Sequence, residues 1–196
     1  MTVYCATGNP GKLREFRLAA ALAGIQVEPV PGLAAISPCE EAGATFEANA
    51  VLKAEYYGSR APGLLFADDS GLEVDALGGA PGVYSARFAG PEATDRANNQ
   101  LLLEKMRGVP GRSARFVCVI ALADRGRMLQ TFCGAVEGQI LEEPRGPHGF
   151  GYDPLFYYPG FGCSFGEAAP ERKLTVSHRG EALRALFRYL SGPHVC

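Results

Sequence analysis

The sequence predicts a fold in which strands and helices are mixed, of the α/β or α+β class. Three observations predict it: a strand pattern that leads directly into a helix near residue 10, a strongly apolar segment over 115–122 with a turn and a partner strand behind it, and an amphipathic helix near the end. With 196 residues, of which 47% are hydrophobic, the chain can bury a core as one domain or as two closely joined lobes. We expect a single domain over residues 1–196.

The first element is a short strand over residues 2–7, followed by a tight loop and a helix whose apolar residues recur from Leu13 onward. Asn9 suits the N-cap of this helix, and Pro10 suits its first position. Free backbone N–H groups at such a helix start, with Lys12 beside them, favour an anion. The spacing is not that of a Walker A loop, because Ala6 stands in place of the first glycine and Leu13 follows the lysine. The alternative is an ordinary strand-to-helix turn with a solvated lysine.

The remaining elements follow from periodicity and from stop signals. Helices are predicted over 45–57 and 95–107, each ended by a glycine, and a hairpin is predicted from strands 115–122 and 128–136 around a turn at 124–127. A last helix begins at Ser177 and has one buried face, formed by Leu183, Leu186, Phe187 and Leu190. Between these elements lies a loop over 144–162 that is rich in glycine and proline and contains Phe150, Tyr152 and Phe156. Its glycines let the backbone approach a ligand, and its aromatic rings offer a flat face for a base.

Two pairs of acidic residues indicate a cation site. Asp68 and Asp69 follow the apolar segment 64–67, at the end of a predicted strand and before a turn, and Glu40 and Glu41 form the second pair. If the fold brings Glu40 near Asp69, their oxygens suit Mg²⁺, which substrate phosphates and water would complete. The alternative is that these acids only hydrogen-bond to nearby backbone N–H groups in a turn.

Ser177, His178 and Arg179 open the last predicted helix. Ser177 suits the N-cap, and the two residues after it would then lie in the first turn, where the helix dipole disfavours positive charge. A ligand that is anionic or carries a carbonyl would relieve this conflict. The alternative is that both are exposed residues of the first turn.

Composition excludes several classes of function. A net charge of -2 gives no broad positive field for nucleic acid, and no apolar segment approaches the roughly 18 to 20 residues needed to cross a membrane. We therefore expect a cytoplasmic protein with no nucleic-acid and no membrane partner. The six cysteines show no C-x-x-C pair, which predicts reduced thiols in the core rather than a metal or redox motif, and neither His148 nor His194 has an identifiable partner.

Taken together, six segments in this order resemble the inosine triphosphate pyrophosphatase family, in its bacterial-type branch. The resemblance spans nearly the whole chain, and the order of the segments is more specific than any one of them. The segments are Thr7-Gly8-Asn9-Pro10-Gly11-Lys12, Glu40-Glu41-Ala42-Gly43-Ala44-Thr45-Phe46, Ala67-Asp68-Asp69-Ser70-Gly71-Leu72, Gly78-Gly79-Ala80-Pro81-Gly82-Val83-Tyr84-Ser85-Ala86-Arg87, Gly149-Phe150-Gly151-Tyr152-Asp153-Pro154 and Ser177-His178-Arg179-Gly180.

The resemblance implies an α/β fold with a strongly curved, mixed sheet and flanking helices that form two lobes around a central cleft. It implies a homodimer that hydrolyses ITP, dITP and XTP to the monophosphate and pyrophosphate with Mg²⁺. Glu40 and Asp69 would bind the metal, Asp69 would also be the proton acceptor, and Asp68 is a plausible helper. The residues implied to bind phosphate are Thr7, Gly8, Asn9, Pro10, Gly11, Lys12 and Lys173, and those implied to bind the nucleoside are Ser70, Phe150, Gly151, Tyr152, Asp153, His178 and Arg179.

The chemistry of the residues is compatible with this assignment. Phe150 can stack on a purine, and donors from His178 and Arg179 would match the 6-carbonyl of hypoxanthine or xanthine but oppose the amino group of adenine. Two other interpretations remain open: a nucleotide sensor that binds without cleaving, and a phosphatase or kinase acting on another small phosphate ester.

Overall fold

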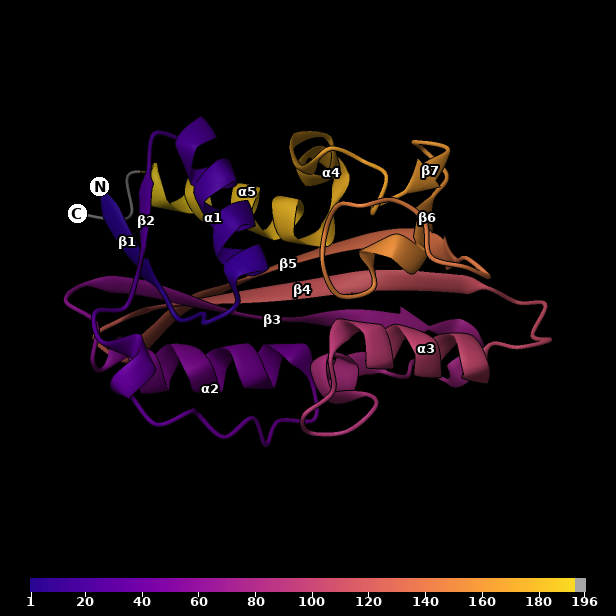
Figure 1. The fold of residues 1–196 in the computed structure, drawn as a ribbon. Coiled ribbons are helices and arrows are strands. Elements are labelled where there is room, and N and C mark those ends of the chain that lie inside the picture. The colour runs from indigo at the N-terminus through magenta and orange to yellow at the C-terminus, as the bar shows by residue number, and fades with distance from the viewer. Residues whose placement is uncertain (193–196) are drawn as a thin grey trace. The chain divides into compact units, whose positions relative to one another are not determined.

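The computed structural model describes residues 1–192 as an α/β fold with a seven-stranded mixed sheet (Figure 1). The strand order is β2-β1-β3-β4-β5-β6-β7. The strands are β1 (Thr2–Cys5), β2 (Gln26–Pro29), β3 (Leu64–Val74), β4 (Ser113–Asp124), β5 (Arg127–Ile140), β6 (Phe156–Tyr158) and β7 (Cys163–Ser164). The α-helices are α1 (Pro10–Leu22), α2 (Phe46–Gly58), α3 (Asp95–Lys105), α4 (Pro170–Val176) and α5 (His178–Leu190). The predicted class is confirmed, while the curvature and the central cleft stay predictions.

The described chain forms two compact units, each made of separate segments. The first comprises residues 1–69, 118–134 and those from 178 onward, and the second comprises 70–117 and 135–177. Strands β3, β4 and β5 each contribute residues to both units. The prediction of one domain over the whole chain stays a prediction.

In the first unit, β1 lies between β2 and β3 and runs parallel to both. Helix α1 packs against β2 and α5, and α2 lies on the other side of the strands (Figure 1). Phe16 of α1 meets Phe66 of β3 edge to face, with ring centroids 5.0 Å apart and both rings almost fully buried. Such a pair is worth about 0.5–1.5 kcal/mol beyond the burial of its area, which anchors α1 over the strand that carries Asp68 and Asp69.

The second unit has its own apolar core, formed by β3, β4 and β5 with α3 and the segment after β5. Phe116, Phe156 and Phe165 are packed against one another at its centre, with centroid separations from 4.5 to 6.3 Å. This core encloses the base of the glycine-rich loop, because Tyr152 and Leu155 belong to the same cluster.

Most helix boundaries agree with the sequence patterns. Asn9, Thr45 and Thr94 cap the first three helices with their side chains, and the last helix buries the predicted apolar face. The helix predicted over 95–107 ends earlier, at Lys105. The last helix begins at His178, because Ser177 has extended backbone angles and follows a separate short helix, α4, that the sequence analysis did not predict.

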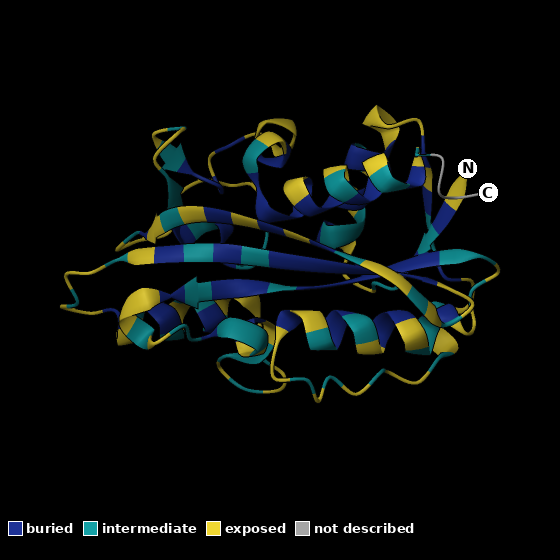
Figure 2. Cartoon of the chain, turned by 180° about the vertical axis from the view of Figure 1, so that it is seen from behind, coloured by how far each residue is buried: buried dark blue, intermediate teal, exposed yellow. Residues whose placement is uncertain are grey.

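Two predicted loops proved to be partly regular structure. Strand β3 does not end at Ala67 but continues to Val74, so Asp68 and Asp69 are strand residues and not turn residues. Figure 2 shows that the long strands of the sheet are buried over much of their length. The segment 144–162 contains a 3₁₀ turn, Asp153–Leu155, and strand β6, which pairs with β5. Both differences come from long-range pairing, which local composition does not encode.

The cysteines only partly follow the prediction of core thiols. Cys5 and Cys118 are buried, and burial is the main reason that the pKa of Cys5 is raised to about 12. Cys39 and Cys163 are half-buried, Cys133 is exposed, and all five are free thiols. Cys196, like His194, lies outside the described residues.

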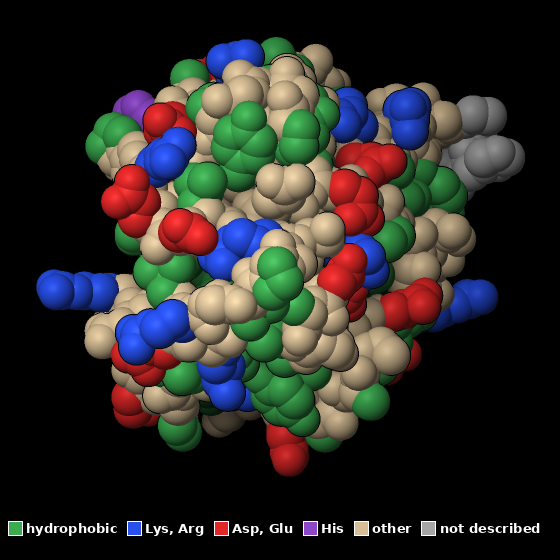
Figure 3. Space-filling view, turned by 90° about the vertical axis from the view of Figure 1, so that its right-hand side faces the viewer, with side chains coloured by type: hydrophobic (Ala, Val, Ile, Leu, Met, Phe, Trp, Pro, Cys, Tyr) green, Lys and Arg blue, Asp and Glu red, His purple; other side chains and the backbone are tan. Residues whose placement is uncertain are grey.

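Within residues 1–192, every helix is too short or too polar to cross a bilayer. On the face drawn in Figure 3, lysine and arginine side chains are interspersed with acidic ones and do not gather into one patch.

Candidate functional site

The loop before α1 is organised by its own side chains. The Asn9 carboxamide oxygen accepts hydrogen bonds from the N–H groups of Gly11 and Lys12, and the Asn9 N–H donates to the Thr7 hydroxyl. The expectation of free backbone N–H groups at this helix start is therefore wrong for these three amides. The positive end of the helix and the Lys12 ammonium remain for an anion, and residues 8–10 are exposed.

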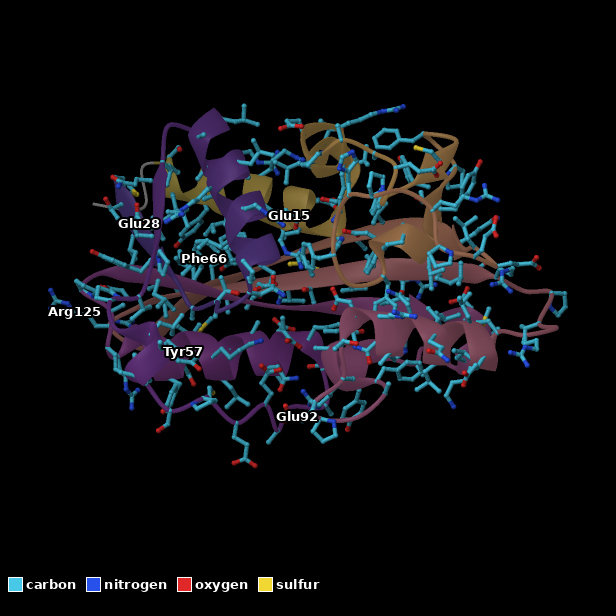
Figure 4. All side chains as sticks on the ribbon, viewed as in Figure 1. Glu15, Glu28, Tyr57, Phe66, Glu92 and Arg125 are labelled. Atoms are coloured by element: carbon cyan, nitrogen blue, oxygen red, sulfur yellow. The ribbon has the colours of Figure 1, made fainter. Side chains whose placement is uncertain are left out.

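Asp68 connects two cations in the first unit. Its Oδ2 lies 2.9 Å from Lys12 Nζ and 3.7 Å from Arg179 Nε, and Arg179 Nη1 also donates to Glu15 of α1, which Figure 4 labels. The Asp68 and Arg179 side chains are almost fully buried, whereas Lys12 is about one-fifth exposed. Lys12 thus reaches the surface from a buried network of alternating charges.

The charges in this network stabilise one another. Burial by itself would raise the pKa of Asp68, but Lys12, Arg179 and Lys53 hold it far below its ordinary value. Burial would lower the pKa of Arg179, yet Glu15 and Asp68 raise it. Asp68 and Arg179 therefore both stay ionised at neutral pH, so Asp68 is suited to hold Lys12 in place and is unsuited to accept a proton.

Asp69 contacts other residues than Asp68 does, and these residues belong to helix α2. Its Oδ1 lies 2.8 Å from Lys53 Nζ, and its Oδ2 accepts a hydrogen bond from the Asn49 carboxamide at 3.4 Å. Lys53 Nζ also lies 3.3 Å from Glu41 Oε1. Lys53 therefore bridges two carboxylates, whereas Glu40, the predicted metal ligand, is exposed.

The pKa values of the two neighbouring carboxylates of β3 are shifted in opposite directions. Burial raises the pKa of Asp69 above its ordinary value, although Lys53 opposes this shift. Burial would lower the pKa of Lys53, but Asp69, Asp68 and Glu41 raise it. A carboxylate whose pKa moves toward neutrality is a better proton acceptor than Asp68, which supports the predicted distinction between the two.

In the second unit, Asp153 organises the glycine-rich loop. Its Oδ2 accepts a hydrogen bond from the Phe150 N–H at 2.9 Å. The same oxygen forms an ion pair with Lys173 Nζ at 2.6 Å. Lys173 Nζ also lies 5.1 Å from the centre of the Phe150 ring, within the range of a cation–π contact. The predicted residues Phe150, Asp153 and Lys173 are therefore neighbours.

Tyr152, another predicted residue of the second unit, is hydrogen-bonded within the protein. The Tyr152 hydroxyl donates to the Ser85 carbonyl at 2.8 Å, and Ser85 Oγ accepts from the Leu72 N–H. Burial raises the pKa of Tyr152 above its ordinary value, so this hydroxyl remains a donor. Gly151 is half-buried, and Ser70 is a half-buried residue of β3.

The predicted site residues thus fall into two groups. Within the first unit lie Thr7, Gly8, Asn9, Pro10, Gly11, Lys12, Glu40, Asp69, His178 and Arg179. Within the second unit lie Ser70, Phe150, Gly151, Tyr152, Asp153 and Lys173. His178 and Arg179 are both buried, so the interpretation of exposed first-turn residues is wrong.

The acidic groups are compatible with Mg²⁺. No cluster of three or more His, Cys, Asp or Glu side chains arranged to hold a metal occurs in residues 1–192. Mg²⁺ nevertheless needs only one or two carboxylates when phosphates and water complete its coordination. The carboxylates of Asp69 and Glu41 both contact a cation, the Lys53 ammonium. The negative charge and the oxygen donors of these two carboxylates also fit a divalent metal.

Three residues of these networks were missed by the sequence analysis: Glu15, Asn49 and Lys53. Helical spacing is the signal that could have found them. Glu15 lies three residues after Lys12, and Lys53 lies four residues after Asn49, so each pair shares a helix face. A buried face that carries polar residues at such spacing indicates a site.

The comparisons with known proteins agree with the resemblance found in the sequence. The sequence model of the Ham1 family matches residues 3–189. A dITP/XTP pyrophosphatase of Acidobacterium capsulatum is 50% identical over 201 residues, which cover 98% of this chain and 99% of that protein. A dITP/XTP pyrophosphatase of Thermus thermophilus is 54% identical, with 98% of this chain and 94% of that protein covered.

Solved structures show the same architecture. The Staphylococcus aureus Ham1 protein superposes with a TM-score of 0.86 at 38% identity, over 98% of this chain and 99% of that one. A HAM1 protein from Coxiella burnetii gives a TM-score of 0.86 at 39% identity, over 97% of this chain and 98% of that one. The α/β fold class and the family predicted from the motifs are therefore confirmed.

Proposed function

The chain belongs to the Ham1 family, and from this membership we propose that it is a nucleoside-triphosphate pyrophosphatase for non-standard purine nucleotides. Its substrates would be ITP, dITP and XTP, and its products the monophosphate and pyrophosphate. The names of its relatives support this reaction. The observation within the chain that supports it most is the adjacent pair Asp68 and Asp69, one fixed in a cation network and the other poised as a base.

We assign phosphate binding in the first unit to residues 7–12. Lys12 Nζ can donate to a phosphate oxygen while it remains paired with Asp68, because an ammonium has three donors. The start of α1 adds its dipole to that charge. In the second unit, Lys173 is the corresponding cation, and it is already positioned by Asp153.

Asp69 is the proposed proton acceptor. It would take a proton from a water molecule that attacks the α-phosphorus, so that the bond to the bridging oxygen breaks and pyrophosphate leaves. Lys12 would neutralise charge that grows on the departing group. When bound, Mg²⁺ would supply further neutralisation of the phosphate oxygens. Its proposed ligands are Asp69 and Glu40, and the contact between Lys53 and Glu41 adds Glu41 as a third candidate.

The nucleoside would be recognised by aromatic stacking and by donors to its edge. Phe150 would stack on the purine with the support of Ser70, Gly151, Tyr152 and Asp153. His178 and Arg179 would donate to the 6-carbonyl and so reject adenine, whose amino group is itself a donor. Since Arg179 is paired with Glu15 and Asp68, its direction is fixed before the substrate arrives.

A substrate panel tests the proposal. The protein is incubated with Mg²⁺ and ITP, XTP or ATP, and pyrophosphate and orthophosphate are measured separately, with EDTA as the control. We expect pyrophosphate from ITP and XTP, little from ATP, and none with EDTA. Orthophosphate alone would mean a phosphatase, and tight binding of ITP without any cleavage would mean a nucleotide sensor. A homodimer and a cytoplasmic location remain predictions from the resemblance.

A further inference from the structure

Helix α3 holds the backbone of the glycine-rich loop at one residue, Gly151. The carboxylate of Asp95 accepts a hydrogen bond from the Gly151 N–H at 2.7 Å, and the carboxamide of Asn99 donates to the Gly151 carbonyl at 2.8 Å. Asp95 and Asn99 are four residues apart, so they lie on the same helix face one turn apart. Both polar groups of one peptide residue are thus held by one rigid element.

The conformation of Gly151 makes this contact specific. Its φ is +59°, in the left-handed region that favours glycine, and the preceding Gly149 has a φ of +79°. The loop therefore has backbone freedom that an external contact must remove. Phe150 stands between these two glycines, and its own N–H is held by Asp153.

A neighbouring residue of α3 holds a different segment. Asn98 accepts from the Ala89 N–H and donates to the Ala86 carbonyl, so it fixes residues 86–89 and makes neither of the contacts to Gly151. Asp95, Asn99 and Phe150 also line a cavity of about 500 Å³ in the second unit. The face of α3 that holds Gly151 is therefore the face beside the aromatic ring.

We infer that Asp95 and Asn99 are positioning residues that set the orientation of Phe150 for the purine. This inference rests on the proposed function, in which Phe150 stacks on the base. The Gly151 N–H belongs to the peptide group that joins Phe150 to Gly151, so its hydrogen bond to Asp95 limits rotation next to the Cα atom that carries the Phe150 ring. The hydrogen bond from Asn99 to the Gly151 carbonyl fixes the other side of the glycine. Neither residue needs to touch the substrate.

Kinetics of Asp95→Ala and Asn99→Ala test this role. Each variant is expected to raise the KM for ITP roughly tenfold while kcat stays within about twofold. The reason is that a less well oriented Phe150 ring stacks less well on the base in the ground state and in the transition state alike. The Ki of inorganic pyrophosphate, which has no base to stack, should not change. The double variant should cost little more than either single one, since both act at Gly151.

Thr94→Ala is the matched control. Thr94 caps the same helix through the Ala97 N–H, so its removal weakens the start of α3 without removing a contact to Gly151. If Thr94→Ala raises the KM for ITP as much as Asp95→Ala does, the role of Asp95 is merely structural and the inference is wrong. A parallel rise in the Ki of pyrophosphate would also overturn it.

A second measurement does not depend on turnover. The chain has no tryptophan, so Phe150→Trp introduces a single tryptophan at this position, and its fluorescence can be excited selectively over that of the tyrosines. In that background, Asp95→Ala and Asn99→Ala should lower the fluorescence anisotropy of the tryptophan, and Thr94→Ala should leave it unchanged. Equal anisotropy in all variants would reject the inference. Failure of the wild-type protein to cleave ITP would instead reject the proposed function.

Discussion

Lys53 Nζ lies 2.8 Å from Asp69 Oδ1, so the proposed catalytic base is paired with a lysine from the middle of helix α2. The same ammonium contacts Glu41. Both partners of the Lys53–Asp69 pair are about nine-tenths buried, which makes their mutual neutralisation important for stability as well as for chemistry.

Lys53→Met is therefore expected to destabilise the protein. Removal of one partner leaves a buried carboxylate without its counter-ion, at a cost of about 3 to 5 kcal/mol in the free energy of unfolding. Urea unfolding measures this, with the exposed Lys105→Met as the control. An equal loss in both variants would show that the buried pair contributes nothing beyond a surface lysine.

Glu40→Gln and Glu41→Gln separate the candidate metal ligands. Glu41 is engaged by Lys53, whereas Glu40 is exposed, so we expect Glu40→Gln to raise the Mg²⁺ concentration for half-maximal turnover by roughly tenfold or more and Glu41→Gln to raise it less. The measurement is a Mg²⁺ titration of ITP cleavage after EDTA treatment and dialysis. The reverse order would transfer the ligand role to Glu41.

Features that depend on nearby residues could be predicted from the sequence, whereas features that depend on long-range contacts could not. The Asn9 cap, the glycine stops and the apolar face of α5 were predictable because each depends on residues within a few positions of one another. The continuation of β3 through Asp68 and Asp69 was not, since carboxylates disfavour a strand. They are tolerated there because Lys12, Arg179 and Lys53 neutralise them, and those cations come from three different helices.

The site residues that were not predicted lie outside the recognisable motifs. The motifs identified Lys12, Asp69 and Arg179, since these residues stand in recognisable segments. Glu15 and Lys53 stand in helix interiors, where a charged residue is usually solvated. Their helical spacing is a weak signal, and their burial in the structure identifies them as partners of the motif residues.

Phe150→Ala is expected to weaken the binding of ITP but not of pyrophosphate. Stacking of a base on an aromatic ring is worth about 1 to 3 kcal/mol, which corresponds to a rise in KM of roughly 5- to 150-fold. Phe150→Tyr keeps the ring and is the matched control. If the two variants have the same KM for ITP, the ring at this position makes no stacking contact with the base.

Asp68→Asn and Asp69→Asn should fail in different ways, although the residues are adjacent and the chemical change is the same. Asp68 is the counter-ion of Lys12 and Arg179, so its neutralisation leaves buried positive charge and should lower the free energy of unfolding by about 3 kcal/mol or more. Asp69 has a raised pKa and accepts the proton in the proposed reaction. Asp69→Asn should therefore abolish turnover while ITP still binds, and the protein should remain folded because Glu41 still neutralises Lys53.

Three measurements on both variants decide this: urea unfolding, the rate of pyrophosphate release, and ITP binding by calorimetry. Retained turnover in Asp69→Asn would remove this residue from the chemistry. A folded Asp68→Asn variant of wild-type stability would show that the network of Lys12 and Arg179 does not depend on its central carboxylate. Because the two side chains project from consecutive residues of one strand toward different partners, the contrast tests the alternation of β3 directly.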